Sequence, residues 1–170
     1  MTSPDQEEPR EVEPALLEGL GRIVVHWAGV DALVNEFWTH LMMASRGSAY
    51  VVTANVSSAT VTDWVRTLMH MRFTNENTLA NLTLLLNRVD ELRAERNALV
   101  HGLWTTHMTD PSTAVVQTVR WTRAEVIKHE VVTVADLNEL SNDIMEMLNE
   151  LSAIGLQLGF IRSKLPPKSA

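Results

Sequence analysis

Apolar residues recur every three or four positions along the first long stretch of the chain, which is the spacing of one face of an α-helix. Steps of four and three join Leu16, Leu20, Ile23, Trp27, Val30, Val34, Phe37 and Leu41. The pattern predicts a helix from about Pro14 to Ser45, and we expect Gly47 to end it as a C-cap.

Two further helices are predicted before residue 104. Residues 48–59 are small and β-branched and are expected to form a connection, after which Thr60 to Asp63 resembles a capping box that begins a short helix. Asn75 to Thr78 forms the next break, and a third helix is predicted from there to about Leu103. The stripe of this helix consists of Leu82, Leu85, Val89, Leu92, Arg96, Leu99 and Leu103, and every member except Arg96 is apolar.

The pattern changes after Gly102 to short runs rich in valine, threonine and tryptophan, which are typical of β-strands. Strands are predicted at Leu103–Met108, Thr113–Trp121 and Val126–Val134, with polar turns between them. They would form a small antiparallel meander of two or three strands, and because so few strands are marginal alone, we expect them to lie against the helices.

A last helix is predicted to begin at the capping box from Thr133 to Asp136. Its heptad-like stripe consists of Leu137, Leu140, Ile144, Met147, Leu151, Ile154, Leu158 and Ile161. The predicted fold is therefore mainly α: a four-helix bundle with a small β insertion, at about 103–134, between helices 3 and 4. We expect one domain over residues 14–165, preceded by a disordered acidic tail over residues 1–13.

Composition and charge exclude several classes of function. The 170 residues include no cysteine, which excludes disulfides, thiol catalysis and cysteine-ligated metals. The net charge is −7, and residues 1–13 contribute −4 of it through five acidic residues and one arginine. This balance argues against a broad surface for nucleic acid but leaves room for a small basic site. With neither a signal peptide nor a membrane span in the pattern, a cytoplasmic location is expected.

The charged break in the third stripe is the strongest candidate for chemistry. Arg96 interrupts apolar positions, Asn97 and His101 share a helix face, and Gly102 puts His101 in the last turn. Five residues separate Arg96 from His101, so they lie about 140° apart around the helix and flank a groove. Arginine binds phosphate through a planar fork, and histidine can act as general acid or base, so together they could cut RNA without a metal.

The segment Arg96-Asn97-Ala98-Leu99-Val100-His101 resembles the Arg-x4–6-His signature of HEPN domains, in which a polar residue often follows the arginine. The resemblance implies a helical bundle that dimerises and places two motifs in one cleft. It also implies metal-independent endoribonuclease activity, often in toxin–antitoxin or defence systems. By that analogy Arg96 and His101 are catalytic, with Asn97 positioning them or the phosphate. The implied partners are RNA, a second copy and an antitoxin or other protein.

Less specific interpretations of the motif stay open. Arg96 could pair with a carboxylate such as Asp31 or Glu95, while His101 caps the helix. The acidic balance favours a second function, a non-catalytic HEPN-like module that binds a protein or a nucleotide. No membrane partner is expected.

Other polar and aromatic residues near the motif are expected to be structural or exposed. Arg93 is expected to be a solvated charge, and His107 to be exposed. Trp104 could stack a base but is expected to pack in the core. Glu36 and His40 do not have the spacing of a carboxylate-bridged metal site, so neither a metal nor a cofactor is expected.

Overall fold

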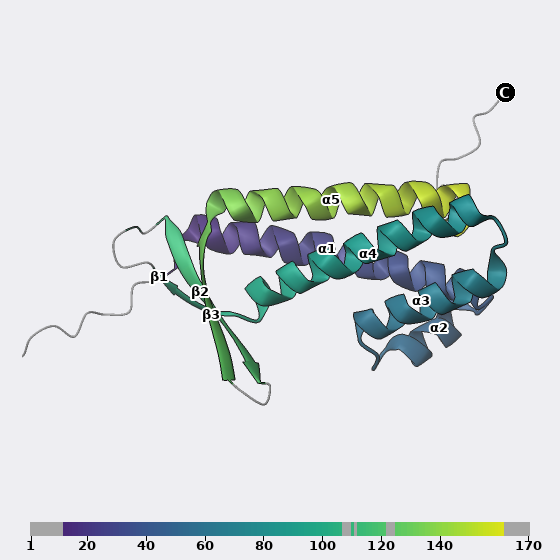
Figure 1. The fold of residues 1–170 in the computed structure, drawn as a ribbon, viewed down its shortest axis with the longest axis horizontal. Helices are drawn as coiled ribbons and strands as arrows, with labels where there is room; N and C mark the ends of the chain where they lie inside the picture. The colour runs from purple at the N-terminus through teal and green to yellow at the C-terminus, as the bar shows by residue number, and fades with distance from the viewer. Residues whose placement is uncertain (1–11, 107–109, 111, 122–124, 162–170) are drawn as a thin grey trace, which may run out of the picture. The chain divides into compact units, whose positions relative to one another are not determined.

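A computed structural model of the chain describes residues 12–106, 110, 112–121 and 125–161. These residues form five helices and three strands (Figure 1). In chain order they are α1 (Pro14–Leu41), α2 (Arg46–Thr53), α3 (Ser58–Arg72), α4 (Glu76–Val100), β1 (Leu103–Thr106), β2 (Thr113–Trp121), β3 (Glu125–Thr133) and α5 (Val134–Gln157). The prediction of a mainly helical fold with a small antiparallel sheet before the last helix is confirmed.

The chain divides into two compact units. The sheet unit comprises the described residues of Met1–Val24 and Ala94–Asn142, and the helical unit comprises those of Val25–Arg93 and Asp143–Ala170. Each of α1, α4 and α5 contributes to both units. The Arg96 segment and all three strands therefore belong to the sheet unit.

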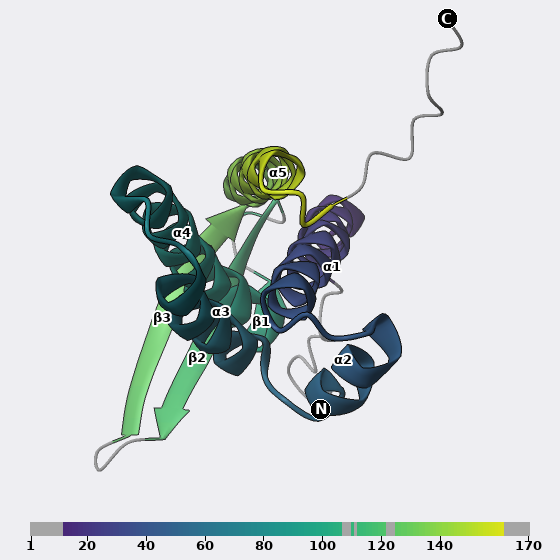
Figure 2. The ribbon, with the colours of Figure 1, turned by 90° about the vertical axis from the view of Figure 1, so that its right-hand side faces the viewer.

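The sheet has the order β1-β2-β3, with both neighbouring pairs antiparallel (Figure 2). β1 pairs only with Ala114–Gln117 of β2, whereas β2 and β3 pair along their whole length. One face of the sheet carries the buried side chains of Ala114, Val116 and Val132. In β3, the five residues from Ile127 to Val131 are exposed.

The backbone makes a close approach at the junction between α4 and β1 in the sheet unit. A Cβ atom on Gly102 would lie 2.3 Å from Cγ1 of Val116 and 2.7 Å from the carbonyl oxygen of Ala98. Just beyond this passage, the indole N–H of Trp104 donates to the carbonyl of Leu99 over 2.7 Å and satisfies one of the last free carbonyls of α4. Glycine therefore lets β1 begin directly against the end of the helix.

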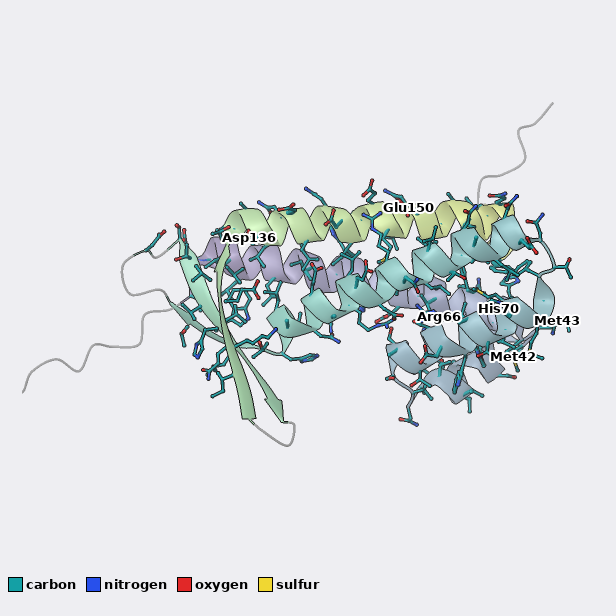
Figure 3. The ribbon with its side chains drawn as sticks, viewed as in Figure 1. Met42, Met43, Arg66, His70, Asp136 and Glu150 are labelled. Carbon is teal, nitrogen blue, oxygen red and sulfur yellow. The ribbon has the colours of Figure 1, made fainter. Side chains whose placement is uncertain are left out.

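The helical unit has an apolar core with side chains from four helices. Its fully buried members include Phe37, Met69, Leu86, Val89, Ile144, Met147 and Leu151. At its surface, Arg88 of α4 pairs with Glu146 and Glu150 of α5 at 2.7 and 3.1 Å (Glu150 is labelled in Figure 3). The hydrogen bond to Glu146 raises the pKa of the Arg88 guanidinium above its ordinary value.

The first connection is where the prediction is wrong. α1 ends at Leu41, four residues early, and Met43 adopts the left-handed conformation at φ 52° that Gly47 was expected to provide. Gly47 instead lies in α2, within the segment predicted to be a connection. Ser45 caps α2 by accepting from the N–H of Ser48, and Ala49 is its one buried residue. With so little burial, α2 has no apolar stripe to reveal it.

Of the two predicted capping boxes, the structure confirms one. α3 begins at Ser58, where Ser57 accepts from the N–H of Thr60, so the predicted cap at Thr60 is wrong by three residues. The predicted capping box of α5 is confirmed, since the Thr133 N–H donates to Asp136 and the Asp136 N–H donates back to the Thr133 hydroxyl. Asp136 lies in the first turn of α5, beside the end of β3 (Figure 3).

The close approach at Gly102 predicts a specific loss of stability. Replacing Gly102 with alanine forces a methyl group into occupied space, and we expect the free energy of unfolding in urea to fall by about 1–3 kcal/mol. Gly21→Ala is the matched control, because nothing lies within 4 Å of its added Cβ. That control should raise stability by about 0.5–1 kcal/mol, as expected for alanine in a helix interior. Equal effects of the two substitutions would contradict this account of the junction.

Candidate functional site

Arg96 is half-buried near the end of α4, and its side chain lies against that of its neighbour. Its Nη1 donates to Oδ1 of Asn97 over 2.9 Å. Its Nε is buried and has no hydrogen-bond partner in the described part of the chain. The amide of Asn97 thus holds one terminal nitrogen of the guanidinium, and the remaining terminal donors have no partner among the described residues.

The lack of a carboxylate partner distinguishes Arg96 from most other arginines among the described residues. Five of them contact carboxylates: Arg22 with Glu18, Arg46 with Glu36, Arg66 with Asp63 and Asp90, Arg88 with Glu146 and Glu150, and Arg93 with Asp90. Arg72 has no such partner but is exposed. Among the arginines that are described and at least half-buried, Arg96 alone carries a positive charge without a neighbouring carboxylate.

His101 is the first residue beyond α4, and its side chain is exposed. Its backbone N–H donates to the carbonyl of Asn97 over 3.1 Å, which extends the helical hydrogen bonding by one residue. Gly102 and β1 follow at once. The imidazole is therefore exposed where the helix ends and the sheet begins, and it has no hydrogen-bond partner among the described residues.

Asn97 is in contact with both members of the predicted pair. Its side chain accepts from Arg96, and its backbone carbonyl accepts from His101. Within the described residues, no hydrogen bond or ion pair joins the side chains of Arg96 and His101. One chain therefore presents a guanidinium and an imidazole near one helix end, on different sides of it.

A carboxylate partner for Arg96 is the structural alternative, and the described residues do not provide it. Asp31 accepts a hydrogen bond from Ser58 at 2.5 Å, and Glu95 is exposed. Glu95 adjoins Arg96 in a helix, where neighbouring side chains diverge, so this alternative finds no ion pair among the described residues. The positive charge of Arg96 is left for a partner from outside the described residues.

Arg93 corrects a second expectation, because it is buried rather than solvated. Only 9% of the residue is exposed, and its guanidinium donates to Asp90 and, over 2.6 Å, to Thr62. It also lies 5.9 Å from the centre of the Trp27 ring, within the range of a cation–π contact. All these partners lie in the helical unit, so Arg93 has a structural role there.

Trp104 has a structural role as well. Its indole N–H is committed to the carbonyl of Leu99, and the residue is half-buried. This agrees with the expectation that Trp104 packs within the fold rather than stacking a base. His107 lies outside the described residues.

A concave site that the sequence did not indicate lies at the end of α1 in the helical unit. It encloses about 360 Å³ and is lined by Glu36, Thr39, His40, Met43, Ala44 and Arg46. Glu36 and Arg46 pair at 3.0 Å across it. No three histidine or acidic side chains in the described part of the chain gather where they could hold a metal ion.

Comparison with known proteins returned no match among protein-family models, curated proteins or solved structures. In the residues that the structure describes, no helix has both the length and the apolar character needed to cross a membrane.

The Trp104 contact yields a prediction that separates capping from simple burial. Trp104→Phe keeps an aromatic ring but removes the donor to Leu99, and we expect the free energy of unfolding to fall by about 0.5–1.5 kcal/mol. Trp64→Phe is the control, since Trp64 is also half-buried and its indole has no hydrogen-bond partner among the described residues. If thermal or urea denaturation gives the same loss for both variants, the hydrogen bond contributes nothing.

Proposed function

We propose that this protein is a metal-independent endoribonuclease of the HEPN type, with Arg96 and His101 as catalytic residues. Two chains would form one cleft, and each would bring its own arginine and histidine. Asn97 acts as a positioning residue through its contact with Arg96. A role as a toxin or defence protein, with an antitoxin partner, belongs to the same proposal.

The observation that carries the proposal is the unpaired charge of Arg96. A half-buried guanidinium without a carboxylate has lost part of its hydration and gained little in return. A phosphate group supplies the missing negative charge and accepts two parallel N–H bonds from the same fork. The imidazole of His101 is exposed and has no hydrogen-bond partner among the described residues, so it is open to a phosphodiester bound in the cleft.

The proposed reaction needs one proton acceptor and one proton donor. The neutral imidazole of His101 takes the proton of a 2′-hydroxyl, whose oxygen attacks the adjacent phosphorus. The bond from phosphorus to the 5′-oxygen breaks, and the partner's His101, in its protonated form, gives that oxygen a proton. The Arg96 guanidinium stabilises the negative charge that develops on the phosphoryl oxygens. The products are a 2′,3′-cyclic phosphate and a 5′-hydroxyl.

Two features lead us to require two chains. On one chain, Arg96 and His101 lie roughly 140° apart around the helix and so face different sides of it. One chain offers one imidazole, whereas the reaction uses an acid and a base on opposite sides of the phosphorus. A second copy supplies the other imidazole without any rearrangement of α4.

A role in binding without catalysis is the competing function, and the net charge of −7 favours it. It differs in one measurable outcome. A binding module would retain RNA or a nucleotide intact, whereas the proposed enzyme converts RNA to cyclic phosphate ends in excess EDTA.

Removal of the imidazole should abolish cleavage while the fold remains. We expect His101→Ala to lower the rate of RNA cleavage in EDTA by about 100-fold or more, because general acid–base catalysis contributes at least that much. His70→Ala is the matched control, since His70 is an exposed histidine in the last turn of α3 and should leave the rate unchanged (Figure 3). Cleavage that survives in His101→Ala would remove this residue from the mechanism.

A change in the shape of the cation at position 96 tests the phosphate contact separately. Lysine keeps the charge but loses the planar fork, so we expect Arg96→Lys to lower kcat/KM for RNA by about tenfold or more. Arg72→Lys, at an exposed arginine without a carboxylate partner, should cleave at the parental rate. Urea denaturation of both variants shows whether the loss comes from the fold. Equal activity of Arg96→Lys and the parent would contradict a bidentate phosphate contact.

A further inference from the structure

β3 is a long edge strand with an open side. The order of the sheet leaves one side of its nine residues without a neighbouring strand among the described residues (Figure 2). The five consecutive residues from Ile127 to Val131 are exposed, so neither face of this stretch is covered. Ile127 and Val131 are 44% and 56% exposed. Such an edge offers a row of unpaired N–H and carbonyl groups to another strand.

The order of side chains along this edge is symmetric about His129. Lys128 and Glu130 flank it with opposite charges, and Ile127 and Val131 flank these with apolar groups. Neither Lys128 nor Glu130 has an ion-pair partner in the described part of the chain. The stretch from Glu125 to Thr133 contains no proline or glycine that would block pairing.

We propose that β3 is a self-pairing surface, at which the β3 strands of two copies join antiparallel about a two-fold axis through His129. In this register Lys128 lies opposite Glu130 of the partner subunit, and Glu130 lies opposite Lys128 of the partner subunit. Likewise, Ile127 lies opposite Val131 of the partner subunit, and Val131 lies opposite Ile127 of the partner subunit. The two charged residues thus gain a neighbour of opposite charge, and the two apolar residues gain an apolar neighbour.

Charge selects this register over its neighbours. A shift of the pairing by two residues in one direction places Lys128 opposite its own copy. The same shift in the other direction places Glu130 opposite its own copy. Like charges directly opposite one another destabilise a strand pair. A strand of unrelated sequence would not repeat this arrangement, so a second copy of this chain is the partner that the edge fits.

This surface is separate from the cleft proposed for RNA cleavage. Joined at β3, the two sheets form a continuous sheet of six strands, with the two β1 strands at its outer edges. Five spacings of roughly 4.8 Å put these strands about 24 Å apart. His101 lies next to β1, so the two His101 residues of such a pair cannot share one phosphodiester. The inference therefore does not rest on the proposed nuclease activity.

The absence of cysteine makes a direct test possible. His129→Cys in the full chain places the only thiol on the proposed two-fold axis, opposite its own copy. A short bifunctional thiol crosslinker should convert this variant to a covalent dimer at micromolar protein. Failure to crosslink at concentrations up to about 1 mM would overturn the proposal, because even a weak interface would be populated there.

Charge reversal then tests the register and controls for chance collisions. In the His129→Cys background, Lys128→Glu alone and Glu130→Lys alone should each slow crosslinking by about tenfold or more, because each creates two like-charged pairs. The variant carrying both reversals should crosslink at the parental rate. An equimolar mixture of the two single variants should recover to about half that rate, because half of its encounters join unlike chains. Equal rates for the single variants and the parent, or no recovery in the mixture, would overturn the register.

Circular dichroism of each variant shows that the strands are formed. Lys128 and Glu130 are both exposed, so the charge reversals remove no core contact. The RNA cleavage rate of the single variants should stay at the parental value. A loss of cleavage together with crosslinking would contradict the separation of the two surfaces.

Discussion

The close passage of the backbone at Gly102 is the constraint on which the candidate site and the sheet both depend. A side chain there would overlap Val116 and the carbonyl of Ala98, so the passage exists only because residue 102 is glycine. It ends α4 at Val100, leaves His101 exposed, and starts β1 within two residues. The hydrogen bond from Trp104 to Leu99 then fastens the strand to the helix end. The backbone passage at Gly102 therefore determines both the exposure of His101 and the position of β1.

Arg96 differs from the other arginine near this helix end, Arg93, in its ion pairing. Arg93, one turn before Asn97, is buried with Asp90 and Thr62 and lies over Trp27, so its charge is satisfied inside the protein. Arg96 is half-buried, and among the described residues its hydrogen-bond partner is the amide of Asn97. Two arginines three residues apart therefore differ in chemistry because of their surroundings. The first stabilises the fold, and the second retains the capacity to bind an anion.

The sequence was sufficient to predict an element of the fold where the pattern of residues was local and periodic. It predicted all three strands, the long helices and the capping box at Thr133, because each follows from spacing along the chain. It failed for α2, in which only Ala49 is buried, since a helix without an apolar stripe leaves no periodic signal. It failed for Arg93 because Thr62 lies 31 residues away along the chain and meets it only after folding. The link between Arg96 and Asn97 is local, and the resemblance to HEPN domains pointed to it.

The central claim is that Arg96 and His101 form one phosphodiester site. The most direct measurement is an NMR titration of the full chain, labelled with ¹⁵N in its arginine and histidine side chains, with a 2′-O-methyl RNA that cannot be cleaved. The account predicts that the side-chain signals of Arg96 and His101 shift together at the same RNA concentration, while those of Arg93 and His70 stay in place. RNA binding that leaves Arg96 and His101 unshifted, or no binding at millimolar RNA, would contradict it.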